Sequence, residues 1–180
     1  SRGLGDVYKR QGVRAGRVKH EMALEAAVVY DLCHERIVDL GRWDYVSHQV
    51  IASPFKPIDY MDKIDVLAAR YLTDTKITCK YLTVELKKDE AEKSTIDQIL
   101  KYVDWVCTEY AYGDYEMIEA CIIAAGYEEG MDRYYREVVQ RHYTQGSHPV
   151  RNKQWNNLKL LKYTCVDGEI VYEDVTPPLR

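Results

Sequence analysis

The sequence predicts an α/β domain built around one mixed β-sheet with helices flanking it. Three observations predict it. Short apolar runs of strand length, bounded by turn residues, alternate along the chain with longer segments of helical composition. The 180 residues are sufficient to bury one hydrophobic core. The sequence contains no internal repeat and no low-complexity segment that would indicate another architecture.

The predicted elements follow the order α-β-β-β-α-β-α-β-β. Helices are expected where helix-forming residues are frequent or apolar residues recur at helical spacing, at residues 17–33, 94–110 and 128–143. Strands are expected where apolar and β-branched residues dominate, at residues 48–52, 64–72, 77–87, 116–125, 158–165 and 169–175. Loops are expected at residues 54–63, 88–93 and 146–149.

Turn and capping residues set the boundaries of these elements. Ser53-Pro54 ends the first strand. Residues 73–76 and Asp167-Gly168 form polar turns between apolar runs, so each predicts a β-hairpin. Ser94, followed three residues later by Asp97 in the manner of a capping box, predicts the start of the second helix.

The first eleven residues differ from the rest of the chain. Residues 1–11 read SRGLGDVYKRQ and have no apolar periodicity. They resemble the translation of a transposase sequencing adapter, so we expect them to lie outside the fold. Residues 12–180 are then a single domain, read from assembled environmental DNA of prokaryotic or viral origin. This interpretation leaves open a further N-terminal domain upstream of Gly12.

Composition argues against several kinds of protein. The formal charge is −4, and it becomes −6 without the net +2 of residues 1–11, so bulk positive charge cannot hold nucleic acid. The five cysteines form no CxxC pair and the five histidines no HxxxH pair, which argues against a zinc site and for a reducing, cytoplasmic compartment. No apolar run approaches the ~20 residues that a membrane span needs.

The most informative stretch of the chain is Leu82-Thr83-Val84-Glu85-Leu86-Lys87. Because side chains alternate between the faces of a strand, Glu85 and Lys87 share one face while the opposite face is wholly apolar. The apolar residues around the pair indicate a buried strand, where a charged face needs a reason. A plain ion pair on the exposed face of a half-covered sheet is the alternative.

Asp65 is a second carboxylate inside an apolar run, between Ile64 and Val66. Adjacent carboxylates repel unless a cation lies between them, and oxygen ligands suit Mg²⁺ or Mn²⁺. We therefore expect Asp65 and Glu85 to bind a divalent cation. Lys87 would lower the pKa of the attacking water, orient it or stabilise the pentacovalent phosphorus. The alternative for Asp65 is a turn or capping residue.

Two helices supply further candidates. Glu21 and Glu25 lie within about 40° of each other on the apolar stripe of the first helix, so either could bind the metal or remain solvent-facing. Gln98 and Tyr102 share one face of the second helix and could contact a phosphate. The candidates for contacts to the nucleic-acid backbone are Lys88 and Lys101. An ordinary amphipathic surface helix is the alternative for residues 94–110.

These residues carry a family resemblance. Asp65, the Val84-Glu85-Leu86-Lys87 strand and the Gln98-Ile99-Leu100-Lys101-Tyr102 helix together resemble the D…ExK…QxxxY pattern of the PD-(D/E)xK nuclease superfamily. The helix with Glu21 or Glu25 is similar to one that precedes this core in many members. Residues 64–105 look most like the C-terminal nuclease domain of the NucS/EndoMS type. The resemblance implies a restriction-endonuclease-like fold, Mg²⁺-dependent cleavage of DNA, and a role in repair or defence.

The sequence departs from the family pattern in three places. Lys63-Ile64 stands where the motif has its proline, and the stretch from Asp65 to Glu85 is long, which we attribute to extended hairpin strands. Residues 128–180 have no counterpart. Basic and aromatic side chains mix in this tail, where they could contact nucleic acid or form ordinary surface: Tyr134, Tyr135, Arg136, Arg141, Arg151, Lys153 and Trp155.

The sequence thus predicts a metal-dependent DNA endonuclease without a membrane partner, with homodimer formation left open. Two alternatives belong to other classes. One is a catalytically silent nucleic-acid-binding or scaffold domain with the same fold, although such a domain need not keep Asp65, Glu85 and Lys87 together. The other is a structural domain in which the Glu85-x-Lys87 pair is a coincidence.

Overall fold

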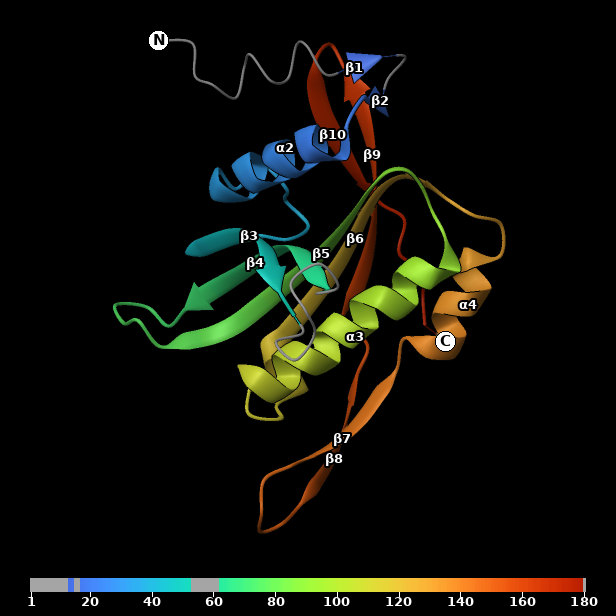
Figure 1. The fold of residues 1–180 in the computed structure, drawn as a ribbon. Helices are drawn as coiled ribbons and strands as arrows, with labels where there is room; N and C mark the ends of the chain where they lie inside the picture. Colours follow the sequence, from blue (N-terminus) through green and yellow to red (C-terminus); the bar gives the residue numbers. More distant parts are fainter. Residues whose placement is uncertain (1–12, 15–16, 53–61, 180) are drawn as a thin grey trace.

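A six-stranded mixed sheet lies at the centre of the computed structural model, in the strand order β10-β9-β6-β5-β4-β3 (Figure 1). The structure describes residues 13–14, 17–52 and 62–179. The elements in chain order are β1 (Val13–Arg14), β2 (Arg17–Val18), α2 (Glu21–Cys33), β3 (Tyr45–Ile51), β4 (Lys63–Tyr71), β5 (Thr78–Ala91), α3 (Lys93–Glu109), the 3-10 helix η2 (Tyr115–Met117), β6 (Ile118–Tyr127), α4 (Met131–Val138), β7 (Arg141–Gln145), β8 (Arg151–Trp155), β9 (Leu158–Val166) and β10 (Glu169–Asp174).

The sheet combines antiparallel and parallel neighbours. Strand pairs β3–β4, β4–β5 and β9–β10 are antiparallel, whereas β5–β6 and β6–β9 are parallel. Parallel neighbours need a crossover connection, and α3 provides it between β5 and β6. The predicted fold class, an α/β domain with one mixed sheet flanked by helices, is confirmed.

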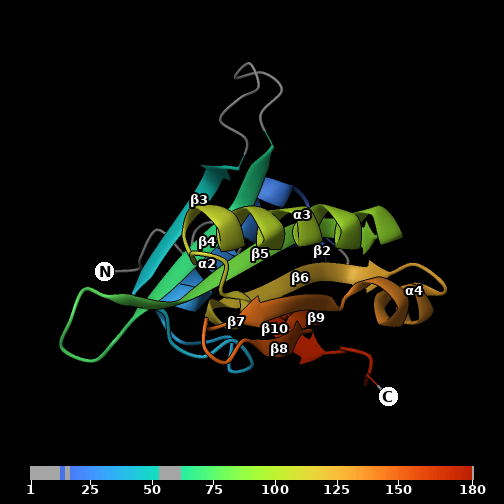
Figure 2. The same ribbon diagram turned by 90° about the horizontal axis from the view of Figure 1, so that it is seen from below.

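Helices cover both faces of the sheet (Figure 2). Leu82, Val84 and Leu86 of β5 are fully buried in one core cluster with Leu24 and Val28 of α2. The opposite face packs against α3, in a second cluster that includes Ile96, Ile99, Val103 and Ile122. Burying each such side chain contributes about 1.5–3 kcal/mol. The apolar face that alternation predicted for β5 is therefore the face beneath α2.

Both predicted hairpins are confirmed. Asp167 and Gly168 have φ values of 51° and 81°, and they join Val166 to its partner Glu169. Positive φ at both central positions is the mark of the type I′ turn that matches the twist of the flanking strands. The β4–β5 hairpin begins at the pair Tyr71↔Thr78, after the predicted polar turn.

Two boundaries around the second helix were predicted wrongly. The expected loop at residues 88–93 is mostly strand, because β5 continues to Ala91 and pairs there with Tyr127 of β6. A register shift separates this extension from Lys87. Ser94 does not cap α3: the helix begins at Lys93 with Glu92 as its N-cap residue, which makes no capping bond through its side chain.

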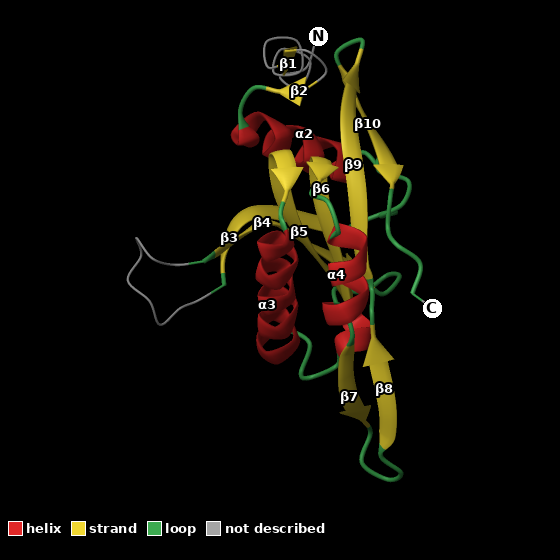
Figure 3. Cartoon of the chain, turned by 90° about the vertical axis from the view of Figure 1, so that its right-hand side faces the viewer, coloured by secondary structure: helices red, strands yellow, loops and turns green. Residues whose placement is uncertain are grey.

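The other two predicted helices are shorter than expected. The first begins at Glu21, because Arg17–Val18 pairs with Val13–Arg14 as β2. The third ends at Val138, and Arg141–Gln145 forms β7, which pairs with β8 around the predicted 146–149 loop. Figure 3 shows this two-stranded ribbon extending beyond α3 and α4, away from the central sheet. Residues 1–11 and most of the expected 54–63 loop lie outside the described residues.

Candidate functional site

The β4–β5 ladder brings Asp65 and Glu85 to the same place. Its pairing runs from Tyr71↔Thr78 to Val66↔Val84. One further step of this register places Asp65 opposite Glu85, at the point where the described pairing between the two strands ends. Beyond it, β4 continues beside β3 and β5 continues beside β6. The two predicted carboxylates therefore lie where neighbouring strands part.

The side chain of Glu85 is almost completely buried, with 2% of its surface exposed. Its Oε1 accepts a 2.8 Å hydrogen bond from Nζ of Lys87, whose side chain is 29% exposed. Its Oε2 is buried and has no hydrogen-bond partner among the described residues. The hydroxyl of Thr83, two residues earlier on the strand, is also buried without a partner there. A buried carboxylate oxygen without a partner lowers the stability of the fold, which makes Glu85 and Thr83 unusual among the buried residues.

Asp65 is held by bonds from two directions. Its Oδ2 accepts from the backbone N–H of Leu86 at 2.8 Å, which fixes it beside Glu85. Its Oδ1 accepts a longer, 3.4 Å bond from Nε2 of Gln49. These bonds fix the orientation of Asp65, and its predicted alternative role as a turn or capping residue is wrong because it lies inside β4.

Gln49 and His48 are the site residues that sequence reasoning missed. Gln49 lies between the β3–β4 pairs His48↔Val66 and Val50↔Ile64, next to Asp65, and its φ of 53° is in the left-handed region. Its Nε2 donates to Oε2 of Glu25 at 2.7 Å, and Nδ1 of His48 lies 2.6 Å from the other oxygen of Glu25. The available signal was a pair of adjacent polar residues in an otherwise alternating strand, which is weak.

The two helix glutamates take different positions. Glu25 is joined to Asp65 through the amide of Gln49, and its carboxylate is already occupied by Gln49 and His48. Glu21 is exposed, and its Oε2 accepts only a weak 3.5 Å bond from the backbone N–H of Lys88. The negative charge of Glu21 acts on Asp65, Glu85 and Lys87. Glu21 is therefore the less engaged of the two carboxylates.

The electrostatics of the cluster follow from burial and from crowding of negative charge. Burial, followed by the charge of Asp65, raises the pKa of Glu85 to about 7. Burial also raises the pKa of Asp65, although its bond from Leu86 acts in the opposite sense. For Lys87, burial lowers the pKa, but the bond to Glu85 and the surrounding carboxylates outweigh it and leave the pKa raised. Lys87 is therefore a cation at neutral pH.

The α3 residues are placed beside this cluster. Gln98 donates from Nε2 to the hydroxyl of Tyr102 at 2.9 Å. Burial raises the pKa of Tyr102 to about 12, and the charges of Glu85 and Asp65 add to the effect. The phenol proton has no acceptor among the described residues. Lys101 is exposed, whereas Lys88 is half-buried with its Nζ 3.6 Å from Asp89.

Most of the basic and aromatic residues predicted as candidates in the tail make contacts within the domain. Trp155 and Tyr135 are buried, and each donates to a backbone carbonyl, of Ile118 and Leu158 respectively. Tyr134 donates to Asp97, and Arg136 to Asp132. These side chains anchor α4 and the β7–β8 ribbon.

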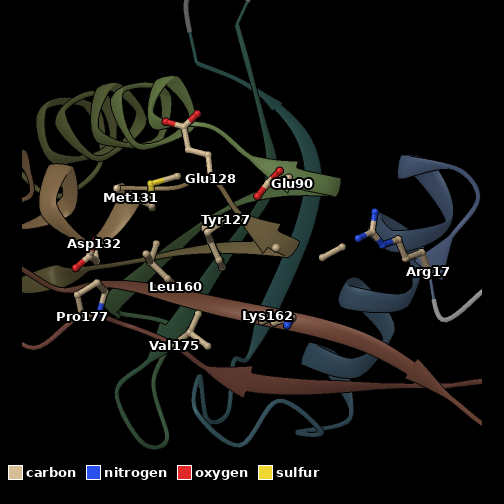
Figure 4. Close-up of a pocket in the computed structure, with 13 residues that line it drawn as sticks. Arg17, Glu90, Tyr127, Glu128, Met131, Asp132, Leu160, Lys162, Val175 and Pro177 are labelled. Carbon is tan, nitrogen blue, oxygen red and sulfur yellow. The ribbon is translucent and has the colours of Figure 1, made fainter.

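A shallow hollow of about 460 Å³ lies at another place, where β5 and β6 end and α4 begins (Figure 4). Glu90, Glu128, Arg17 and Lys162 contribute charges of both signs to its wall. Its lining does not include Asp65, Glu85 or Lys87, so it is separate from the carboxylate cluster.

No preformed metal cage is present in the described part of the chain. Among residues 13–14, 17–52 and 62–179, no group of three or more His, Cys, Asp or Glu side chains is arranged to hold a metal ion. No helix of this part is long and apolar enough to cross a membrane.

Two solved structures are similar to the chain. A repair endonuclease from Pyrococcus abyssi shares 20% sequence identity with a TM-score of 0.43, over 63% of this chain and 43% of that chain. The structure of an EndoMS–dsDNA complex shares 19% identity with a TM-score of 0.38, over 65% of this chain and 39% of that chain. The chain thus spans less than half the length of either protein. No model of a protein family matches the chain, and no curated protein matches it.

Proposed function

We propose that this chain is a divalent-cation-dependent endonuclease that hydrolyses DNA phosphodiester bonds, with Asp65, Glu85 and Lys87 at its centre. The observation that carries the proposal is the buried carboxylate of Glu85. One of its oxygens has no hydrogen-bond partner within residues 17–52 and 62–179, and Lys87 and Asp65 lie beside it. Burying a charged side chain lowers the stability of the fold. A cation bound to the carboxylates, and an anionic substrate beside Lys87, would offset that cost.

The donor set suits Mg²⁺ or Mn²⁺. Mg²⁺ is usually bound by one or two carboxylates together with waters and substrate phosphates, so a pair of carboxylates is sufficient. Asp65 and the free oxygen of Glu85 would be the protein ligands, and Glu21 is the next carboxylate available. When bound, the cation supplies Lewis-acid chemistry, which offsets phosphate charge and makes water more acidic.

The remaining residues would position the substrate. Lys87, held as a cation, would bind the scissile phosphate and stabilise its added negative charge in the transition state. Gln49 would hold Asp65 and Glu25 in fixed orientations. The phenol proton of Tyr102, which has no acceptor in the described chain, and the amide of Gln98 would contact the DNA or a bound water.

The competing proposal is a silent domain with the same fold. A silent scaffold gains nothing from burying a carboxylate with an unsatisfied oxygen, because the cost of that oxygen falls on stability alone. We therefore favour the enzyme. A role in DNA repair or defence and a cytoplasmic site of action follow from the sequence resemblance and remain part of the proposal, as does a homodimer.

A cleavage assay tests the proposal. Single-stranded, mismatched and branched DNA would be incubated with the chain and Mg²⁺ or Mn²⁺. We expect Lys87→Ala, Glu85→Gln and Asp65→Asn each to lower the rate by at least about 100-fold. Lys76→Ala and Glu109→Gln change the same kinds of charge at exposed positions and should leave the rate unchanged. Equal rates in the site variants and the wild type would remove Asp65, Glu85 and Lys87 from the mechanism.

A further inference from the structure

The charge of the chain is distributed very unevenly. The whole sequence has 25 Lys and Arg residues against 29 Asp and Glu. Residues 138–157 nevertheless contain three Lys and Arg and no Asp or Glu. This segment includes the whole β7–β8 ribbon, the part of the chain that projects from the central sheet (Figures 1 and 3). A projecting segment without any carboxylate is compatible with a polyanionic partner.

The inner face of the ribbon is fastened to the domain. Arg141 donates to both carboxylate oxygens of Asp104, at 3.0 and 3.4 Å. Lys153 pairs with Glu116, and the indole N–H of Trp155 donates to the carbonyl of Ile118 at 2.8 Å. These contacts neutralise Arg141 and Lys153 and fix the direction of the ribbon.

The outer face carries exposed hydrogen-bonding groups. Alternation along the two strands places His142 opposite Gln154, and Thr144 opposite Asn152. All four side chains are exposed. None of them has a hydrogen bond or ion pair to another residue of the described chain. Arg151, next to the turn, is likewise exposed and without an acidic partner there. Amide, imidazole and hydroxyl groups of this kind can donate to and accept from base edges.

The size of the ribbon suits a groove of duplex DNA. Paired strands lie about 4.8 Å apart, and the major groove, about 12 Å wide, admits a two-stranded ribbon. The position is also suitable. Trp155 is anchored at Ile118, and Glu85 lies opposite Ile122 in the β5–β6 register. Ile118 and Ile122 are four residues apart, so the base of the ribbon at Trp155 lies about 13 Å from Glu85 along β6, and the exposed ribbon residues lie further out along β8.

We infer that the β7–β8 ribbon docks duplex DNA in its major groove, with His142, Thr144, Asn152 and Gln154 facing the bases and Arg151 facing a phosphate. This inference rests on the proposed function, because it assigns the ribbon to the substrate of the Glu85 site. The path from Glu85 to the ribbon base and on to Asn152 is about 23 Å along the strands, or about seven base-pair steps of B-DNA, so one duplex is long enough to reach both elements.

Binding measurements test the inference without cleavage. The full chain would be titrated with fluorescent duplexes and with the matching single strands in EDTA, and anisotropy would be read at several salt concentrations. Arg151→Ala should weaken duplex binding about fivefold and reduce the salt slope by about one. The double variant Asn152→Ala/Gln154→Ala should lower the preference for duplex over single strand about tenfold.

Matched controls and outcomes complete the design. Arg133→Ala and Asn156→Ala alter exposed residues outside the ribbon and should bind as the wild type does, with unchanged circular dichroism. Equal losses in Arg133→Ala and Arg151→Ala, or equal wild-type affinity for single strands and duplexes, would overturn the inference. A chain that binds duplex through the ribbon but cleaves no DNA overturns the proposed function instead. A chain that cleaves DNA while all ribbon variants bind normally overturns only the inference.

Discussion

Glu85 and Lys87 lie two positions apart on β5, and Nζ of Lys87 donates to one oxygen of Glu85 at 2.8 Å while the other oxygen remains buried without a described partner. The Glu85 carboxylate therefore has one oxygen in a salt bridge and one oxygen whose hydrogen-bonding capacity is unsatisfied.

Ionisation of Glu85 should make the cation-free protein less stable as the pH rises. The pKa of Glu85 is raised from 4.5 to about 7, first by burial and then by Asp65. The folded protein therefore holds a proton that the unfolded chain has lost. This stabilisation is complete below about pH 4.5 and disappears as the pH rises through 7, with a total of about 3 kcal/mol.

The check is urea unfolding in EDTA between pH 5 and pH 8. Glu85→Gln removes the titrating group, so its free energy of unfolding should vary less over this range, and it should be more stable than the wild type at pH 8. Glu109→Gln, at an exposed position, should keep the wild-type slope. Parallel slopes for Glu85→Gln and the wild type would show that Glu85 does not titrate in this window.

Divalent cations should stabilise the fold through the same carboxylates. At a free Mg²⁺ or Mn²⁺ concentration 100 times the Kd, the expected gain is about 2.7 kcal/mol. Differential scanning calorimetry would record an increase in Tm for the wild type, and for Glu109→Gln as the control. Glu85→Gln and Asp65→Asn should lose most of the increase. If both site variants showed the same cation-induced increase in Tm as the wild type, the cation would bind at another place in the protein.

Gln49 has two separable roles, because its amide bridges Glu25 and Asp65 while its backbone is in the left-handed region. Gln49→Ala and Gln49→Gly both remove the amide, so cleavage should fall about tenfold in each. Glycine adopts positive φ with less strain than alanine. The free energy of unfolding of Gln49→Gly should therefore be about 1 kcal/mol larger than that of Gln49→Ala. Equal stabilities would indicate that the backbone of Gln49 is unstrained.

Tyr127 should contribute to stability through its hydroxyl. The hydroxyl lies 2.8 Å from the carbonyl of Ile122 and 2.9 Å from that of Leu161, and so bridges β6 and β9. Tyr127→Phe should lower the free energy of unfolding by about 1 kcal/mol. Tyr112→Phe is the matched control, since Tyr112 is 94% exposed and its hydroxyl has no bond in the described chain. The contrary result is an equal denaturant midpoint for the two variants.

Local pattern was sufficient for much of the fold. Alternation at residues 82–87 predicted the apolar face of β5, and Asp167-Gly168 predicted the β9–β10 turn, because both signals act between near neighbours. The same local argument failed for residues 88–91. These residues are charged, yet they remain in β5 because pairing with β6 is a long-range contact that composition does not reveal.

The site was predictable in part for the same reason. Asp65 and Glu85 each stand out as a carboxylate within an apolar run, and the structure brings them together at the end of one ladder. Gln49 could not be found in this way, because its role depends on a cross-strand register and on a positive φ. The ribbon of β7 and β8 has only Tyr143 and Trp155 as apolar residues on its inner face, and ion pairs with Asp104 and Glu116 hold the rest of that face, so the apolar signal is too weak to predict two strands.

The parting of β4 from β5 also bears on solubility. Up to Val84, β5 is an interior strand, whereas from Glu85 onward its described pairing is with β6 alone. From that point no strand covers this edge within the described chain, and the backbone N–H groups of Leu86 and Lys88 donate to the side chains of Asp65 and Glu21. An edge of this kind is a template for the addition of a strand from another molecule. Lys87, Lys88, Asp89 and Glu90 occupy this edge, and a row of charges is the usual protection against such pairing. The same residues that border the carboxylate cluster therefore also discourage aggregation of the chain.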